Sequence, residues 1–152
     1  MIKIDADFLI DRRKRIWEKY QDINRDEKFV DAVCFEILQN QKLRIEIIEN
    51  PEKLIELTFT VVDKKKKVMP FFLNYVQQKF IEILNKAIKD YNEGLITNIS
   101  ILILKGRQQG FTTLITAIQL ARTITRHNFE GLTLSDKSSN TEAIFQNKAK
   151  DD

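Results

Sequence analysis

Hydrophobic positions in the first third of the chain repeat mainly at helical spacing. Between residues 6 and 21 they are uneven and interrupted by a basic run, which predicts a partly buried helix. A clearer stripe at steps of three and four predicts a second helix ending near Asn40; it consists of Phe29, Val30, Val33, Cys34, Ile37 and Leu38. Asn50-Pro51 predicts the start of a short helix to about Leu57, because asparagine caps free backbone amides and proline at the first helical position loses no hydrogen bond.

The middle of the chain changes to a strand pattern. Residues 58–62 and 68–73 are rich in β-branched and aromatic side chains around a polar turn, which predicts a hairpin with Pro70 on an edge strand. Asn74 then predicts the cap of a helix that ends near Gly94. The apolar face of that helix consists of Val76, Phe80, Ile83, Leu84, Ala87 and Ile88.

A nearly continuous apolar run, residues 99–104, is typical of a strand covered on both faces. A loop with two glycines and a helix from Thr112 to about Ile124 follow it. A second candidate strand at residues 131–135 and a last helix beginning near Ser139 complete the order β-loop-α-β-α. This order predicts an α/β fold: an incomplete P-loop NTPase-type parallel sheet with an N-terminal helical segment and a β-hairpin.

Composition narrows the class of protein. The charged fraction of 31% and the hydrophobic fraction of 43% are those of an ordinary globular domain. No apolar run approaches the roughly 20 residues of a bilayer-spanning helix, and the N-terminus lacks a signal peptide, so we expect an intracellular protein without membrane association. The chain has one cysteine, Cys34, and one histidine, His127, which excludes an internal disulfide and argues against a Cys/His metal site. We expect Cys34 to be a core residue of its helix and His127 to lie on the surface.

The net charge of +3 hides two basic runs, residues 12–15 and 64–67. Each is either a surface for phosphate backbones or an ordinary solvated face. The carboxylates of the first 48 residues lie scattered among basic residues without convergent spacing, which indicates solvated charge and no catalytic site. They include Asp5, Asp11, Asp22, Asp26 and Asp31.

The loop between the apolar run and the next helix carries the candidate chemistry. It consists of Lys105, Gly106, Arg107, Gln108, Gln109, Gly110, Phe111, Thr112 and Thr113. It occupies the place of a Walker A loop, whose backbone amides and helix N-terminus bind the phosphates of a nucleotide. Gly110 allows close approach of the backbone, and Thr112 stands where a hydroxyl would bind the Mg²⁺ of Mg-ATP.

The loop nevertheless fails the strict Walker A pattern. Phe111 replaces the usual lysine, and Lys105 replaces the first glycine. Lys105 or Arg107 remains to supply the cation that the β- and γ-phosphates require, and the sequence does not decide between them. The alternative is a tight strand-to-helix turn with two glycines and incidental basic residues.

Two segments of the chain resemble motifs of one family. The loop sequence Lys-Gly-Arg-Gln-Gln-Gly-Phe-Thr-Thr resembles the deviant Walker A loop of tailed-phage terminase large subunits, the ATPases of viral DNA-packaging motors. Residues 70–77, Pro-Phe-Phe-Leu-Asn-Tyr-Val-Gln, resemble the adenine-side motif of that family. The resemblance makes Gln77 the expected reader of the base, with Gln78 as the fallback, because a carboxamide donates and accepts at once. Residues 122–126 and the segment ending at Asp136 continue the similarity, which covers about residues 50–148.

The resemblance implies a helical N-terminal segment at residues 1–49 and the front part of a P-loop ATPase domain at residues 50–152, truncated before the Walker B strand. It implies ATP and Mg²⁺ as cofactors, and double-stranded DNA, the portal protein and the small terminase subunit as partners of the full-length protein. It also implies a location in the host cytoplasm, with transient docking on the prohead. Since the Walker B strand, its catalytic glutamate and the nuclease domain are not among the 152 residues, we expect this chain to bind ATP without hydrolysing it.

Two other functions fit the same residues. One is a fragment of a different P-loop motor, such as a helicase-like or recombination ATPase. The other is a non-enzymatic module from a prophage remnant, in which the glycine loop is only a turn and the basic N-terminal helix binds DNA or a protein partner.

Overall fold

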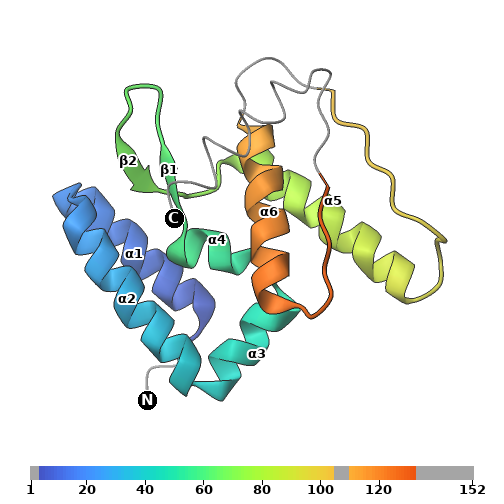
Figure 1. Ribbon diagram of the computed structural model, residues 1–152, viewed down its shortest axis with the longest axis horizontal. Helices are drawn as coiled ribbons and strands as arrows, with labels where there is room; N and C mark the ends of the chain where they lie inside the picture. Colours follow the sequence, from blue (N-terminus) through green and yellow to red (C-terminus); the bar gives the residue numbers. More distant parts are fainter. Residues whose placement is uncertain (1–3, 105–109, 133–152) are drawn as a thin grey trace.

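The computed structural model describes residues 4–104 and 110–132, and this part of the chain is mainly helical. Its helices are α1 (Ala6–Tyr20), α2 (Ile23–Gln39), α3 (Gln41–Glu49), α4 (Lys53–Thr58), α5 (Tyr75–Asn92) and α6 (Phe111–Thr125). Strands β1 (Thr60–Val62) and β2 (Val68–Pro70) form one antiparallel hairpin. In Figure 1, α1, α2 and the hairpin lie on one side of the short helix α4, and α6 and α5 lie on the other.

The predicted α/β fold, an incomplete P-loop NTPase-type parallel sheet, is wrong for this structure. The only sheet among the described residues is the two-stranded hairpin, in which Thr60 pairs with Pro70 and Val62 with Val68. The apolar run 99–104 forms no strand with any other described segment, and Leu102 and Leu104 are 85% and 88% exposed. A strand covered on both faces needs neighbouring strands, and the described residues provide none for this run.

Of the second predicted strand, residues 131–135, the structure describes only Gly131 and Leu132, and neither belongs to a strand. Residues 133–135 and the last predicted helix, near Ser139, lie outside the described residues.

The other predicted elements are confirmed by the observed order. Asn74 caps α5 as expected: its Oδ1 accepts a hydrogen bond from the backbone N–H of Gln77, and the Gln77 side chain accepts one from the Asn74 N–H. Gly94, with φ +74°, follows the end of this helix. Two details differ. Helix α3 was not expected, and α4 begins after Glu52 without a side-chain cap, so Asn50 does not cap it.

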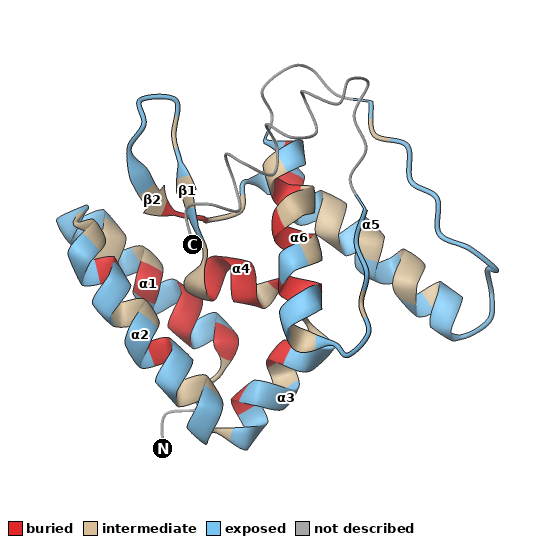
Figure 2. Ribbon diagram, in the orientation of Figure 1, coloured by how far each residue is buried: buried red, intermediate tan, exposed pale blue. Residues whose placement is uncertain are grey.

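The hydrophobic core gathers around α4. Ile55 and Leu57 of α4 and Leu114 and Ala121 of α6 have no exposed surface. Figure 2 shows the buried segments along α4 and on α6 in red. Helix α4 contacts α1, α2 and α6, so a six-residue helix joins the N-terminal helices to α6. The predicted apolar face of α5 is only partly buried, because Phe80 and Leu84 pack against the core while Val76 and Ile83 are more than half exposed.

The prediction of Cys34 as a core residue is wrong, because Cys34 is exposed on α2.

A buried ion pair lies at the centre of the N-terminal helices. Arg13 of α1 and Asp26 of α2 are 0% and 1% exposed, and two hydrogen bonds join them, Nε to Oδ1 at 2.8 Å and Nη2 to Oδ2 at 2.7 Å. The prediction of Asp26 as solvated charge is therefore wrong. Arg13 also donates to the carbonyl oxygens of Glu56 and Phe59, in the last turn and at the end of α4, at 3.0 and 3.1 Å. One guanidinium thus binds three elements together and satisfies carbonyls that the helix itself leaves free.

Replacement of Arg13 by methionine is expected to lower the free energy of unfolding by about 3–5 kcal/mol, because it leaves the Asp26 carboxylate buried without its partner. Urea denaturation followed by circular dichroism measures the change. Arg12→Met is the matched control, since Arg12 is exposed on the same helix and its loss is expected to cost no more than about 0.5 kcal/mol. Equal losses in the two variants would show that the buried pair does not hold these helices.

Candidate nucleotide-binding site

Gln77 lies in the first turn of α5 and is 5% exposed. Its Oε1 accepts a hydrogen bond from the Asn74 N–H at 3.0 Å, which is half of the capping box. Its Nε2 donates to the backbone carbonyl of Gly110 at 3.4 Å. The residue expected to read the base is therefore held at the junction of α5 and α6 by contacts within the protein.

Gly110 is the residue at which the two predicted motifs meet. It is the N-cap of α6 and has φ +71°, a conformation that L side chains rarely adopt. A Cβ atom at this position would also lie 3.1 Å from the Nε2 of Gln77. Backbone conformation and the close approach of Gln77 both favour glycine. The predicted approach of the Gly110 backbone to phosphates stays a prediction.

The N-terminus of α6 presents the other described residues of the loop. Its N-cap residue, Gly110, has no side chain to cap it, and the dipole at a helix N-terminus favours an anion. Thr112 is exposed, whereas Thr113 is half-buried. Phe111 is buried, and its ring meets Phe80 of α5 edge-on with the centroids 5.6 Å apart. The residue that replaces the Walker A lysine is thus a core residue, placed to hold α6 against α5.

The remaining predicted site residues are Lys105, Gly106, Arg107, Gln108 and Gln109. They lie outside the described residues, so their part in phosphate binding stays a prediction. The choice between Lys105 and Arg107 as the main phosphate contact stays open with it.

A cleft of about 390 Å³ lies between α1, the start of α4, and α5. Of the predicted residues, only the fallback Gln78 lines it, and Gln78 donates from Nε2 to the Leu73 carbonyl at 3.2 Å. The charged lining is mainly acidic and consists of Asp7, Glu52, Glu56, Glu82 and Lys53. Carboxylates repel phosphate groups, so this cleft is a poor site for a nucleotide.

A second buried ion pair holds α6 and was not predicted. Arg122, near the end of α6, bonds through Nη2 to Oε1 of Glu52, the residue that precedes α4; both side chains are less than a tenth exposed. Oε2 of Glu52 is buried and has no hydrogen-bond partner among the described residues. The only sequence signal for this pair was the position of Arg122 in the segment that resembles the terminase family.

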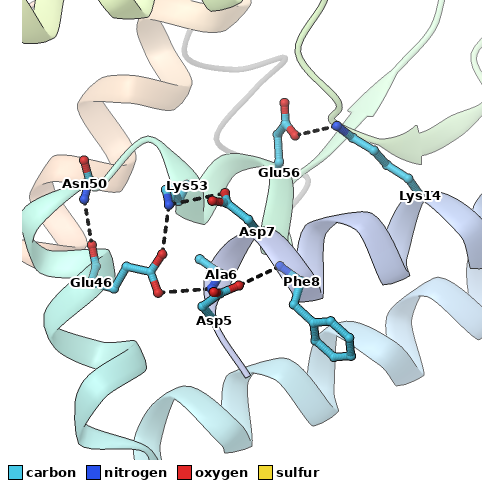
Figure 3. A network of polar contacts seen from close by, with 9 residues as sticks. All are labelled: Asp5, Ala6, Asp7, Phe8, Lys14, Glu46, Asn50, Lys53 and Glu56. Carbon is cyan, nitrogen blue, oxygen red and sulfur yellow. Dashed lines mark hydrogen bonds and ion pairs between the residues drawn. The ribbon is translucent and has the colours of Figure 1, made fainter. Parts of the chain in front are cut away.

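Figure 3 shows the polar network that fixes the start of α1. Glu46 of α3 accepts from the backbone N–H of Ala6 at 3.1 Å and from Nζ of Lys53 at 2.8 Å, and Lys53 also pairs with Asp7 at 3.2 Å. Burial raises the pKa of the Glu46 carboxyl, but the hydrogen bonds from Lys53 and Ala6 outweigh burial and hold this pKa below its usual value. Conversely, burial lowers the pKa of Lys53, and its bonds to Glu46 and Asp7 raise it above its usual value.

Within residues 4–104 and 110–132, no group of three or more His, Cys, Asp or Glu side chains is placed to hold a metal ion. No helix of this part of the chain is both long and apolar enough to span a bilayer. No family model, curated protein or solved structure matches the chain.

Because the pKa of Glu46 is lowered on folding, its stabilising effect is present above the unfolded value of about 4.3 and is lost as pH falls through the folded value. Glu46→Gln is expected to lower the free energy of unfolding by about 1 kcal/mol at pH 7, a difference that shrinks as pH falls from about 5 to about 3. Urea denaturation across this range measures it. Glu49→Gln, an exposed change on the same helix, is the control, and a pH-independent loss in Glu46→Gln would contradict the assignment.

Proposed function

We propose that this chain is the N-terminal part of a viral terminase large subunit and that it binds Mg-ATP at the N-terminus of α6. The phosphates contact the loop that precedes α6, and the adenine lies next to Gln77. The proposal concerns this loop and the two helices. It does not include the parallel sheet that was expected from the sequence.

One observation carries the proposal. Gln77 and Gly110 come from two segments that resemble different motifs of the same family, and they lie in contact although 33 residues separate them. The Phe80–Phe111 ring contact holds the same two helices together a turn further on. The capping box accounts for the rotamer of Gln77, and the contact of this residue with Gly110 supports one site built from both segments.

The chemistry of the junction supports a nucleotide. A helix N-terminus favours an anionic group, and glycine as the N-cap residue lets the anion come close to the backbone. The exposed hydroxyl residue Thr112 is the expected Mg²⁺ ligand, and Lys105 or Arg107 is the expected cation for the phosphates. Gln77 keeps the capacity to read adenine, because each of its two polar atoms uses one hydrogen bond in the protein and has a second donor hydrogen or lone pair left.

The wider function follows from the resemblance and is part of the proposal. In the whole protein, ATP bound here would drive the packaging of double-stranded DNA into proheads, with the portal protein and the small terminase subunit as partners. For the residues named above, the proposal assigns binding of Mg-ATP and no hydrolytic step.

Isothermal titration calorimetry with Mg-ATP tests the phosphate contacts. We expect the parent chain to bind, and whichever of Lys105→Ala and Arg107→Ala removes the main contact to weaken binding by about 10- to 100-fold, the value of one charge-assisted hydrogen bond. Lys86→Ala, on the exposed face of α5, is the charge-matched control and is expected to bind as the parent does. A folded parent chain that does not bind Mg-ATP would rule the proposal out for this chain.

Gln77→Glu tests base reading without loss of the helix cap, because glutamate at this position also completes a capping box. The variant loses the amide that donates to the Gly110 carbonyl and would donate to the base, and it places a negative charge beside the phosphate loop. Thermal unfolding by circular dichroism checks that it folds. We expect it to fold, to bind ATP about ten-fold or more weakly, and to lose any preference for ATP over GTP. Gln78→Glu is the neighbouring control; if it removes the preference and Gln77→Glu does not, the base is read from Gln78.

A further inference from the structure

The turn between β1 and β2 is held by one aspartate. The Asp63 carboxylate accepts hydrogen bonds from the backbone N–H groups of Lys65 at 2.7 Å and Lys67 at 2.9 Å. The Asp63 N–H donates to the Lys67 carbonyl at 2.9 Å, and the Lys66 N–H donates to the Asp63 carbonyl at 3.0 Å. The backbone of this turn therefore has a defined shape.

Lys66 is not the residue that this shape favours. Its φ is +59°, in the left-handed region, where glycine and asparagine are common and a lysine costs about 1 kcal/mol or more. Turn geometry alone gives no reason for lysine at this position.

The charge of the turn also indicates a binding role. Residues 64–67 are four exposed lysines, and Asp63 is the one carboxylate of the turn, which gives a local charge of 4 − 1 = +3. Backbone amides already occupy the Asp63 carboxylate, and adjacent lysines repel one another. Lys67 lies over the ring of Trp17 at 5.6 Å, so the turn is attached to α1. The fold thus holds a local net positive charge at a defined position beside α1.

The outer face of α1 carries three further basic side chains. Arg12, Arg15 and Lys19 are exposed at spacings of three and four, and no ion pair joins any of them to another described residue. The exposed carboxylates of Asp11 and Glu18 lie four residues before and three residues after Arg15 and offset its charge, which leaves Arg12 and Lys19 as the basic contacts of this face. The two basic runs of the sequence therefore belong to one helix and the hairpin attached to it.

We propose that the β1–β2 turn is a binding arm for the phosphate backbone of double-stranded nucleic acid, with Arg12 and Lys19 of α1 as a second contact. Lysine suits this partner because its ammonium group is a point charge that contacts phosphates without a fixed geometry, whereas bidentate recognition of carboxylates is a property of arginine. The turn has no apolar side chain between Val62 and Val68 that would enter a membrane. Single strands are usually bound by free aromatic faces, and Lys67 covers Trp17.

Fluorescence anisotropy with a labelled duplex of about 30 base pairs and arbitrary sequence tests this surface, which is independent of nucleotide binding. Lys65→Gln/Lys66→Asn removes two charges and keeps the turn, because asparagine tolerates a positive φ. At roughly 0.1 M salt we expect binding to weaken about ten-fold, and the slope of log K against log salt to fall by about 1.8, since each phosphate contact contributes about 0.9.

Lys86→Gln/Lys89→Gln on α5 is the control, because it removes the same charge from an exposed surface elsewhere and is expected to leave the slope unchanged. Thermal unfolding by circular dichroism checks that both double variants fold. Equal affinity and equal slope in the parent and the turn variant would overturn the proposal. Tighter binding to a single strand of the same length, or to phosphatidylserine vesicles with the same dependence on Lys65 and Lys66, would overturn the choice of partner.

Discussion

The fold depends on the guanidinium of Arg13, which is buried and must be bonded on every side. Water cannot solvate it there, so Asp26 balances its charge and the carbonyls of Glu56 and Phe59 accept its remaining hydrogen bonds. These partners belong to α2 and to the end of α4, which fixes the position of α4 against α1. The Glu52–Arg122 pair then joins the start of α4 to α6. The candidate nucleotide site at the N-terminus of α6 is thus held by two buried ion pairs at the two ends of one short helix.

The sequence predicted the features that depend on residues within a few positions of each other. The cap of α5 needs only Asn74 and Gln77, the hairpin needs two short β-prone stretches around a polar turn, and each amphipathic stripe repeats within its own helix. The strand at 99–104 failed because burial on two faces is a property of neighbouring strands, which the run itself does not specify. The prediction that Asp26 is solvated was wrong for a related reason. Its partner, Arg13, lies on another helix, and an aspartate in a segment rich in basic residues resembles solvated charge.

The contacts between the residues of the candidate site could not be predicted from the sequence. Spacing gave no indication that Gln77 would bond to Gly110, or that Phe111 would pack against Phe80, because both contacts depend on how α5 and α6 meet. Phe111 also shows why the strict Walker A pattern fails in this chain. Its position faces the core, where a lysine would be buried without a partner, so the cation of the proposed phosphate site would have to come from elsewhere in the loop.

The most direct test of the account is a nuclear magnetic resonance titration of the ¹⁵N-labelled protein with Mg-ATP. The account predicts that the largest chemical-shift changes among the described residues fall on the backbone amides of Gly110, Phe111 and Thr112 and on the side-chain amide of Gln77. Changes confined to the side-chain amides of Gln78 and Asn85, which line the acidic cleft, would place the nucleotide elsewhere and contradict the account. The absence of any change at saturating Mg-ATP would contradict it as well.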